Sequence, residues 1–238
     1  MDSSATWHPP TNPNVQSILH EAWADTQAGR FEEALNKHLW FHEQAHQIDA
    51  DFAGVRLSTA LSFWYQLGQR YPAAMDALCA TRDVAEARVF NNGFREADFD
   101  ELQALNRILR SDRNTAQAFE RIVRQNPAAA YRLFELATPS LLYAEIYEVC
   151  KLLIEPDMQF EHAVTIYNFS LESGEEMRSD AYDALVRSLT NLFSTLVQYE
   201  RRTKAMELLA QFEQQHPDHD WQNVFAPALA GEVRPPRG

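Results

Sequence analysis

The chain has 238 residues, of which 45% are hydrophobic and 11% aromatic, and this composition is typical of a folded protein rather than a disordered one. Only 7 residues are glycine and no clear run of alternating β-branched residues occurs, which favours an all-helical fold. A formal net charge of −13 makes nucleic acid and anionic membrane surfaces unfavourable partners, and no segment approaches the roughly 20 apolar residues of a membrane span.

Both ends of the sequence are polar and rich in proline. Residues 1–13 are predicted to be a flexible lead and residues 231–238 a flexible tail, which leaves 14–230 as one helical repeat domain. The first residues contain neither the basic nor the apolar region of a signal peptide. Cys79 and Cys150 stand in apolar helical surroundings, which predicts two buried thiols in a reducing compartment. We therefore expect a cytoplasmic protein.

A 3.6-residue hydrophobic period runs through the remainder and predicts about 12 helices in series. Gly or Pro marks most of the short turns, among them Gly29, Gly68, Asn126-Pro127 and Thr138-Pro139. Serial helices with short turns lie antiparallel, and the hairpins stack because one hairpin alone has too little apolar surface to be stable. The predicted helices cover residues 14–28, 31–47, 53–68, 71–89, 99–111, 114–126, 128–137, 140–154, 158–172, 179–199, 202–216 and 219–229.

Several of these hairpins share a pattern of turn and packing residues. In GRFEEAL, which begins at Gly29, an aromatic residue follows the glycine two positions later and Ala34 follows three after that. A looser version starts at Gly68, and QQHPD near the C-terminus is an ending of the same kind. This pattern resembles the tetratricopeptide repeat (TPR). The runs HLWFHEQA, GVRLSTALSFWYQLGQRYPAAMDAL and ATPSLLYAEIYEVCKLLIEP resemble a bacterial group of TPR-like proteins without assigned chemistry.

The expected fold is an all-α, right-handed solenoid of antiparallel helices in degenerate TPR-like hairpins, with irregular stacking over residues 97–175. The resemblance implies a helical-repeat interaction protein, so we expect a non-enzymatic scaffold that binds a protein or peptide and needs no cofactor. Some members of the group lie beside toxin genes, which adds a toxin, neutralised as by an immunity protein, as a candidate partner.

The first helix of each hairpin lines the concave groove in this architecture. Counting back along the helices from the turn glycines Gly29 and Gly68 predicts the residues that line the groove. They include aromatic and polar side chains, which suits the binding of a peptide or a protein surface. The lining consists of Leu19, His20, Trp23, Gln27, Ser58, Ser62, Tyr65 and Gln66. Two acidic runs, residues 96–101 and 172–176, are interpreted as helix caps that also offer an acidic surface to a cationic partner.

One run has the spacing of a metal site. HEQAH, residues 42–46, matches H-E-x-x-H, in which two His ligate zinc and the Glu polarises the attacking water. The remainder of a zinc peptidase is not recognisable, because Asp49 and Phe52 stand where metzincins have Gly and His, and no strand is predicted. The alternative function is therefore a zinc-dependent hydrolase that uses HEQAH, with Glu86 as the nearest plausible third ligand.

The same helix offers a simpler interpretation of these histidines. His38 and His42 lie within its apolar stripe, where the repeat places large packing residues, so we interpret them as structural. A metal site made by His38, His42 and His46 on one side of the helix is the alternative. Arg56, a charged residue within an apolar run, is expected to form a local ion pair with Asp51; the alternative is that it faces a partner.

Overall fold

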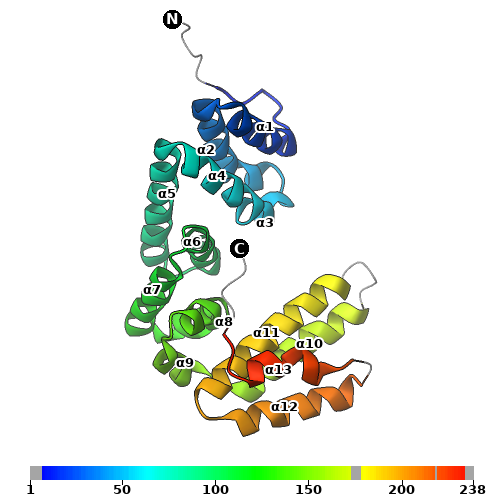
Figure 1. Cartoon of the computed structure of the whole chain (residues 1–238). Helices are drawn as coiled ribbons and strands as arrows, with labels where there is room; N and C mark the ends of the chain where they lie inside the picture. Colours follow the sequence, from blue (N-terminus) through cyan, green and yellow to red (C-terminus); the bar gives the residue numbers. More distant parts are fainter. Residues whose placement is uncertain (1–6, 173–177, 218, 234–238) are drawn as a thin grey trace, which may run out of the picture. The chain divides into compact units, whose positions relative to one another are not determined.

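The protein is all-helical over the residues that the computed structural model describes, which are 7–172, 178–217 and 219–233, with only the backbone of residues 147, 172 and 178 (Figure 1). No strand occurs in this part of the chain, as the sequence predicts. No described helix is long and apolar enough to cross a membrane. The described residues up to Ser111 form one compact unit and those from Asp112 onward form a second. The single solenoid predicted over 14–230 stays a prediction.

Unit 1 contains the first six helices of the chain. They are α1 (Val15–Ala28), α2 (Phe31–Ile48), the short α3 (Phe52–Arg56), α4 (Thr59–Arg70), α5 (Pro72–Asn91) and α6 (Glu96–Ile108). The predicted helix over 53–68 is thus two helices, with Leu57 and Ser58 between them. Sequence neighbours pack together as α1 with α2, α4 with α5, and α5 with α6.

The first hairpin is held together by a tight turn and a buried ion pair. Gly29 ends α1 at φ 79°, a left-handed conformation that glycine adopts without steric cost. Lys37 Nζ of α2 lies 2.6 Å from Asp25 Oδ2 of α1, and both side chains are buried. The ring of Trp7, within the predicted flexible lead, packs edge-on against Trp40 and lies 5.7 Å from Lys37 Nζ. Residues 1–6 of that lead lie outside the described residues.

The second hairpin depends on a close approach of its two helices. Gly68 lies inside α4 and not at the turn, which corrects the role that the sequence suggested for it. A Cβ at this position would lie 3.2 Å from the Cα of Met75 on α5, so the absence of a side chain lets the two backbones meet. Trp64, also on α4, is fully buried and donates its indole N–H to the carbonyl of Ala74 at 3.0 Å.

Unit 2 contains the remaining helices. They are α7 (Asp112–Gln125), α8 (Pro127–Tyr143), α9 (Tyr147–Leu153), α10 (Pro156–Glu172), α11 (Arg178–Gln198), α12 (Arg202–Gln215) and α13 (Trp221–Leu229). Its core gathers aromatic rings, among them Phe193, Phe212, Trp221 and Phe225, which are almost fully buried. Residues 173–177, which include 173–176 of the predicted acidic run, and 234–238 of the predicted tail lie outside the described residues.

One predicted turn in unit 2 is wrong. Helix α8 continues through Pro139 to Tyr143, where the sequence predicted a break at Thr138-Pro139. Pro139 has no N–H to donate to the carbonyl of Glu135, but buried neighbours such as Ala137 and Leu141 hold the segment in the helix. The helix ends instead at Tyr143, and Glu145, two residues beyond it, has a left-handed φ of 60°.

Candidate functional site

The residues of the predicted binding face come from two helices that touch. The Trp23 ring of α1 lies 6.3 Å from the Phe63 ring of α4, and Arg70 of α4 donates to the carbonyl of Thr26 at 2.7 Å. These contacts follow the same order along both helices, so α1 and α4 run in the same direction. We call the surface they share the α1–α4 face.

Most of the predicted lining residues of α1 and α4 are accessible. His20, Gln27, Ser58 and Gln66 are exposed, and Trp23 exposes 43% of its surface. Ser62 and Tyr65 are half-buried, whereas Leu19 is buried in the core with Val15 and Phe41. Leu19 is therefore part of the core of unit 1 and not of its exposed surface.

The histidines of α2 face the interior. His38 and His42 are both buried, which confirms their predicted position in the apolar stripe, and His46 is half-buried. The His38 ring stacks on Trp64 with centroids 6.2 Å apart and 8° between the planes. Burial lowers the pKa of His38 to about 3, so the ring is neutral at physiological pH.

His42 belongs to a buried group of charged side chains. Its Nε2 lies 3.1 Å from Glu101 Oε1 of α6, and Arg56 Nη2 of α3 donates to Glu101 Oε2 at 3.1 Å. Arg88 of α5 donates to the same carboxylate, although its side chain is 41% exposed. We call these four residues the Glu101 cluster; it joins α2, α3, α5 and α6.

The cluster stabilises the ionised form of Glu101. Burial acts to raise the pKa of Glu101, but the hydrogen bonds from His42 and Arg56 outweigh it and the pKa lies well below the usual range. Because an ionised carboxylate only accepts, the His42–Glu101 contact requires a proton on His42 Nε2. Arg56 Nη1 lies 3.3 Å from the same nitrogen. A guanidinium N–H only donates and the protonated Nε2 cannot accept, so this contact is not a hydrogen bond.

These positions bear on the metal interpretations of HEQAH. Arg56 and Arg88 place two guanidinium groups beside His42 and Glu101, and positive charge opposes a bound cation. Glu43, which would polarise water in a peptidase, is exposed. No group of three or more His, Cys, Asp or Glu able to hold a metal ion is found among the described residues.

The Glu101 cluster corrects two expectations. Arg56 does not pair with Asp51; its partner Glu101 lies 45 residues away in the sequence. The acidic run 96–101 is not all surface either, because Asp98 and Glu101 are buried. Asp98 accepts two hydrogen bonds from Arg95, and these are the main reason why its pKa is lowered. These two carboxylates do not serve as surface counter-charges for a partner.

The Glu101 cluster lines a hollow in unit 1 with a volume of about 610 Å³. Imidazole and guanidinium groups of His42, His46, Arg56 and Arg88 form its polar wall, and Leu39, Trp64 and Val84 contribute apolar surface. We call it the α2–α5 hollow. Burial lowers the pKa of His46, and the charge of Arg56 lowers it further while that of Glu101 acts to raise it.

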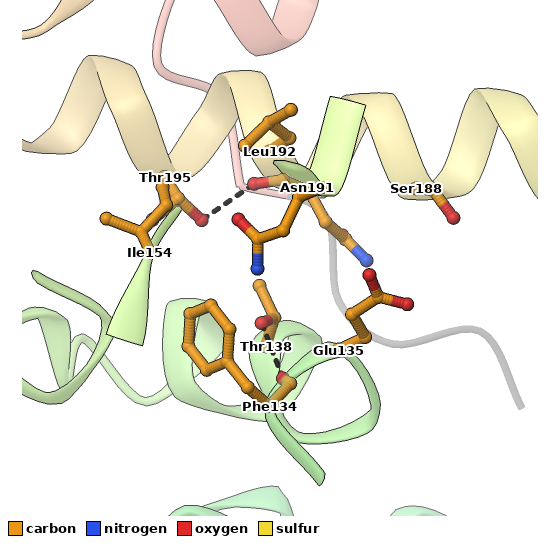
Figure 2. A pocket seen from close by; sticks show the side chains of 9 residues that line it. Phe134, Glu135, Thr138, Ile154, Ser188, Asn191, Leu192 and Thr195 are labelled. Atoms are coloured by element: carbon orange, nitrogen blue, oxygen red, sulfur yellow. Dashed lines mark hydrogen bonds between the residues drawn. The ribbon is translucent and has the colours of Figure 1, made fainter. Parts of the chain in front are cut away.

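A second cavity lies within unit 2, between α8 and α11 (Figure 2). Thr138 and Thr195 each donate a hydroxyl to a carbonyl of their own helix, four residues back, at 2.7 Å. The volume is only about 50 Å³, which is room for a few water molecules and not for a substrate. This cavity is therefore a packing feature of unit 2.

The sequence singles out His42 and Arg56 of the Glu101 cluster but does not show that they associate. It places Glu101 in an acidic surface run and gives no signal at Arg88. The available signal was the charge of Arg56 within an apolar run, which required a buried partner somewhere in the chain.

The TPR-like features have local explanations in the structure. Gly29 supplies a left-handed turn, and Phe31 stacks on Tyr71 with centroids 5.7 Å apart. Tight turns and stacked rings occur in many helical hairpins and do not by themselves identify a family. Comparison of the chain with protein-family models, with curated proteins and with solved structures finds no match.

Proposed function

We propose that the chain is a non-enzymatic interaction module that binds a protein or peptide partner through the α1–α4 face. The observation that carries the proposal is Trp23, which exposes 43% of its surface and rests against Phe63 on the neighbouring helix. A rigid aromatic ring with exposed polar neighbours is the kind of anchor that protein interfaces use.

The arrangement of α1 and α4 adds support. First helices of consecutive hairpins run in the same direction in a stacked repeat, and the contacts of Trp23 and Thr26 follow that order. The proposal therefore keeps the TPR-like solenoid, with a scaffold or a toxin neutraliser as the role. The net charge of −13 favours a cationic partner, and the two free cysteines fit a cytoplasmic protein.

Site-specific crosslinking tests this proposal. A photoreactive amino acid at Gln27, exposed on the α1–α4 face, should capture a defined partner in the native host, and the same group at Tyr131 of α8 should not. With the purified partner, Trp23→Ala should weaken binding by about tenfold or more, whereas Tyr131→Ala should leave it unchanged. Equal effects of both substitutions would refute the assignment of this face.

The hydrolase alternative has less support, because Arg56 and Arg88 place positive charge beside His42 and Glu101. Metal analysis of protein purified without chelator decides between the two. We expect no stoichiometric zinc, and no difference in metal content after His42→Ala and His46→Ala. About one zinc per chain, lost in that double variant, would restore the hydrolase alternative.

A further inference from the structure

Helix α10 of unit 2 is apolar on two sides. One side packs along α11 and contributes Phe160, Val164 and Tyr167 to the core of the unit (Figure 1). The other side is exposed, although it contains Ile166 and Phe169, which expose 49% and 71% of their surface. Phe169 is the most exposed large hydrophobic side chain in the described part of the chain.

The exposed apolar residues lie on one stripe of the helix. Met158, which is 56% exposed, Ile166 and Phe169 stand at positions i, i+8 and i+11, so they fall within about 80° of one another around the helix. His162 stands between them at i+4 and is exposed as well. We call these four residues the α10 face. Single exposed apolar residues are common on protein surfaces, whereas a continuous stripe marks an interaction site.

The dimensions of the α10 face fit one helix. The stripe is about 16 Å long and about 10 Å wide, which gives a footprint of about 160 Å². A stable dimer buries about 800 Å² on each partner, so this face is too small to hold two copies of the chain together. A single amphipathic helix, by contrast, carries apolar side chains at the spacing that packs along such a stripe.

The charges beside the α10 face are negative. Residues 152–171 include Glu155, Asp157 and Glu161 and contain no lysine or arginine. Asp157 is neutralised by Lys204 of α12, whose Nζ lies 2.6 Å from Oδ1, whereas Glu155 and Glu161 are exposed. A second copy of the chain would bring the same carboxylates against these, and an anionic membrane would repel them. Lysine or arginine on a partner would complement this surface.

We propose that the α10 face binds a basic amphipathic helix of a partner protein. The apolar side of that helix packs on Met158, Ile166 and Phe169, and its lysine or arginine residues pair with Glu155 and Glu161. The α10 face belongs to unit 2 and the α1–α4 face to unit 1, so this inference does not depend on the function proposed above.

Fluorescence anisotropy of labelled peptides with the full chain tests this surface. The first probe is a peptide of about 14 leucine and lysine residues with all leucines on one side of the helix. The second has the same composition with the leucines distributed around the helix, and the third has glutamate in place of lysine. We expect the first to bind once per chain and about tenfold more tightly than either of the others, because only it combines an apolar face with positive charge.

Two substitutions locate the peptide on the α10 face. Ile166→Gln and Phe169→Gln each remove an exposed apolar side chain and introduce a good helix former, so both chains should fold. Each should weaken binding of the first peptide by about fivefold or more. Met206→Gln on α12 replaces a side chain that is 53% exposed and should bind like the unchanged protein.

Glu161→Gln tests the charge of the surface. It should weaken binding of the first peptide by about threefold, and by less at high salt, because exposed charges are screened. Glu207→Gln, the same substitution at an exposed position of α12, is the control and should have no effect. Equal binding by these two variants would refute the assignment of a basic partner.

Other results would refute the α10 face as a docking surface. They are binding of the second or third peptide as tight as that of the first, no binding of the first up to about 1 mM, and Ile166→Gln and Phe169→Gln both indistinguishable from Met206→Gln. A dimer in sedimentation, or binding to phosphatidylcholine vesicles, that Ile166→Gln abolishes would assign the face to a second copy or to a membrane instead. Circular dichroism of each variant separates loss of the surface from loss of the fold.

Discussion

At the scale of single residues, Glu101 is the acceptor on which a buried charged group depends. Its carboxylate accepts hydrogen bonds from His42, Arg56 and Arg88, which lie on three different helices. Burying charges is costly unless each has a partner, so these side chains fix how the helices meet as much as they add stability. His42 and Arg56 could take other positions only by leaving charge or hydrogen-bonding groups without a partner.

Removing the charge of Glu101 should therefore be costly. Glu101→Gln leaves Arg56 and Arg88 buried or half-buried without a counter-charge, and we expect the free energy of unfolding to fall by about 3 kcal/mol. Urea denaturation measures this change. Glu32→Gln at an exposed position of α2 is the control and should change the value by less than about 0.5 kcal/mol. A loss at Glu101 as small as that of the control would contradict the structural role of the cluster.

His38 should make stability depend on pH. Its pKa is about 3 in the folded chain and 6.5 in the unfolded one, so below pH 6.5 the unfolded state binds a proton that the folded state does not. Stability is therefore complete above pH 6.5 and is lost towards pH 3, by up to about 1.4 kcal/mol per pH unit.

His38→Phe tests this linkage, because phenylalanine keeps a ring against Trp64 and cannot titrate. Urea midpoints at pH 7, 6, 5 and 4 should fall less steeply for the variant than for the unchanged protein. All other titrating groups are common to both proteins and cancel in the difference. Parallel curves would show that His38 is not held neutral.

At the scale of helices, Gly68 allows α4 and α5 to approach. Alanine is the better helix former by about 1 kcal/mol, but its Cβ would lie 3.2 Å from Met75 Cα and 2.9 Å from Met75 Cε. A backbone atom cannot move aside without shifting the helix. We therefore expect Gly68→Ala to destabilise the protein by about 1–3 kcal/mol, measured as a fall in the free energy of unfolding.

Gly54→Ala in α3 is the matched control, because an added Cβ there meets no atom within 4 Å. That variant should be neutral or slightly more stable. The prediction for Gly68 is wrong if both variants gain stability alike, because helix propensity would then outweigh the close approach.

At the scale of the whole molecule, each compact unit has a hydrophobic core of its own. Phe41 and Leu19 lie in a core cluster of unit 1, and Phe193, Phe212 and Trp221 lie in that of unit 2. A unit with its own core has what it needs to fold by itself. The division after Ser111 therefore predicts two separable domains.

Two fragments test this prediction. Residues 1–111 and residues 112–238, produced separately, should each give a helical circular dichroism spectrum and unfold cooperatively with heat. A fragment cut inside unit 1 after residue 71, between α4 and α5, is the control and should not unfold cooperatively, because it loses the partner of α4. Loss of helical structure in either full unit would show that the chain is one domain.

The sequence predicted the helices better than it predicted their contacts. Helix α1 at Val15–Ala28 and helix α12 at Arg202–Gln215 lie within a residue or two of the predicted ranges, because local period and turn residues define a helix end. Helix α8 was split wrongly because a proline is compatible with a helix when tertiary contacts hold the segment. Of the candidate site, the accessible positions of α1 were predicted and the Glu101 cluster was not.

The sequence by itself determined that this protein is all-helical, and it placed His38 and His42 on the buried side of their helix. Both follow from the 3.6-residue period, which is a local property. Only the tertiary structure decided that Arg56 and Arg88 meet Glu101 and that a hollow forms beside them. Arg56 and Glu101 are 45 residues apart, and no local pattern indicates which of the many acidic residues a buried guanidinium will find. That choice depends on how the helices pack, because burial makes one pairing far less costly than the others.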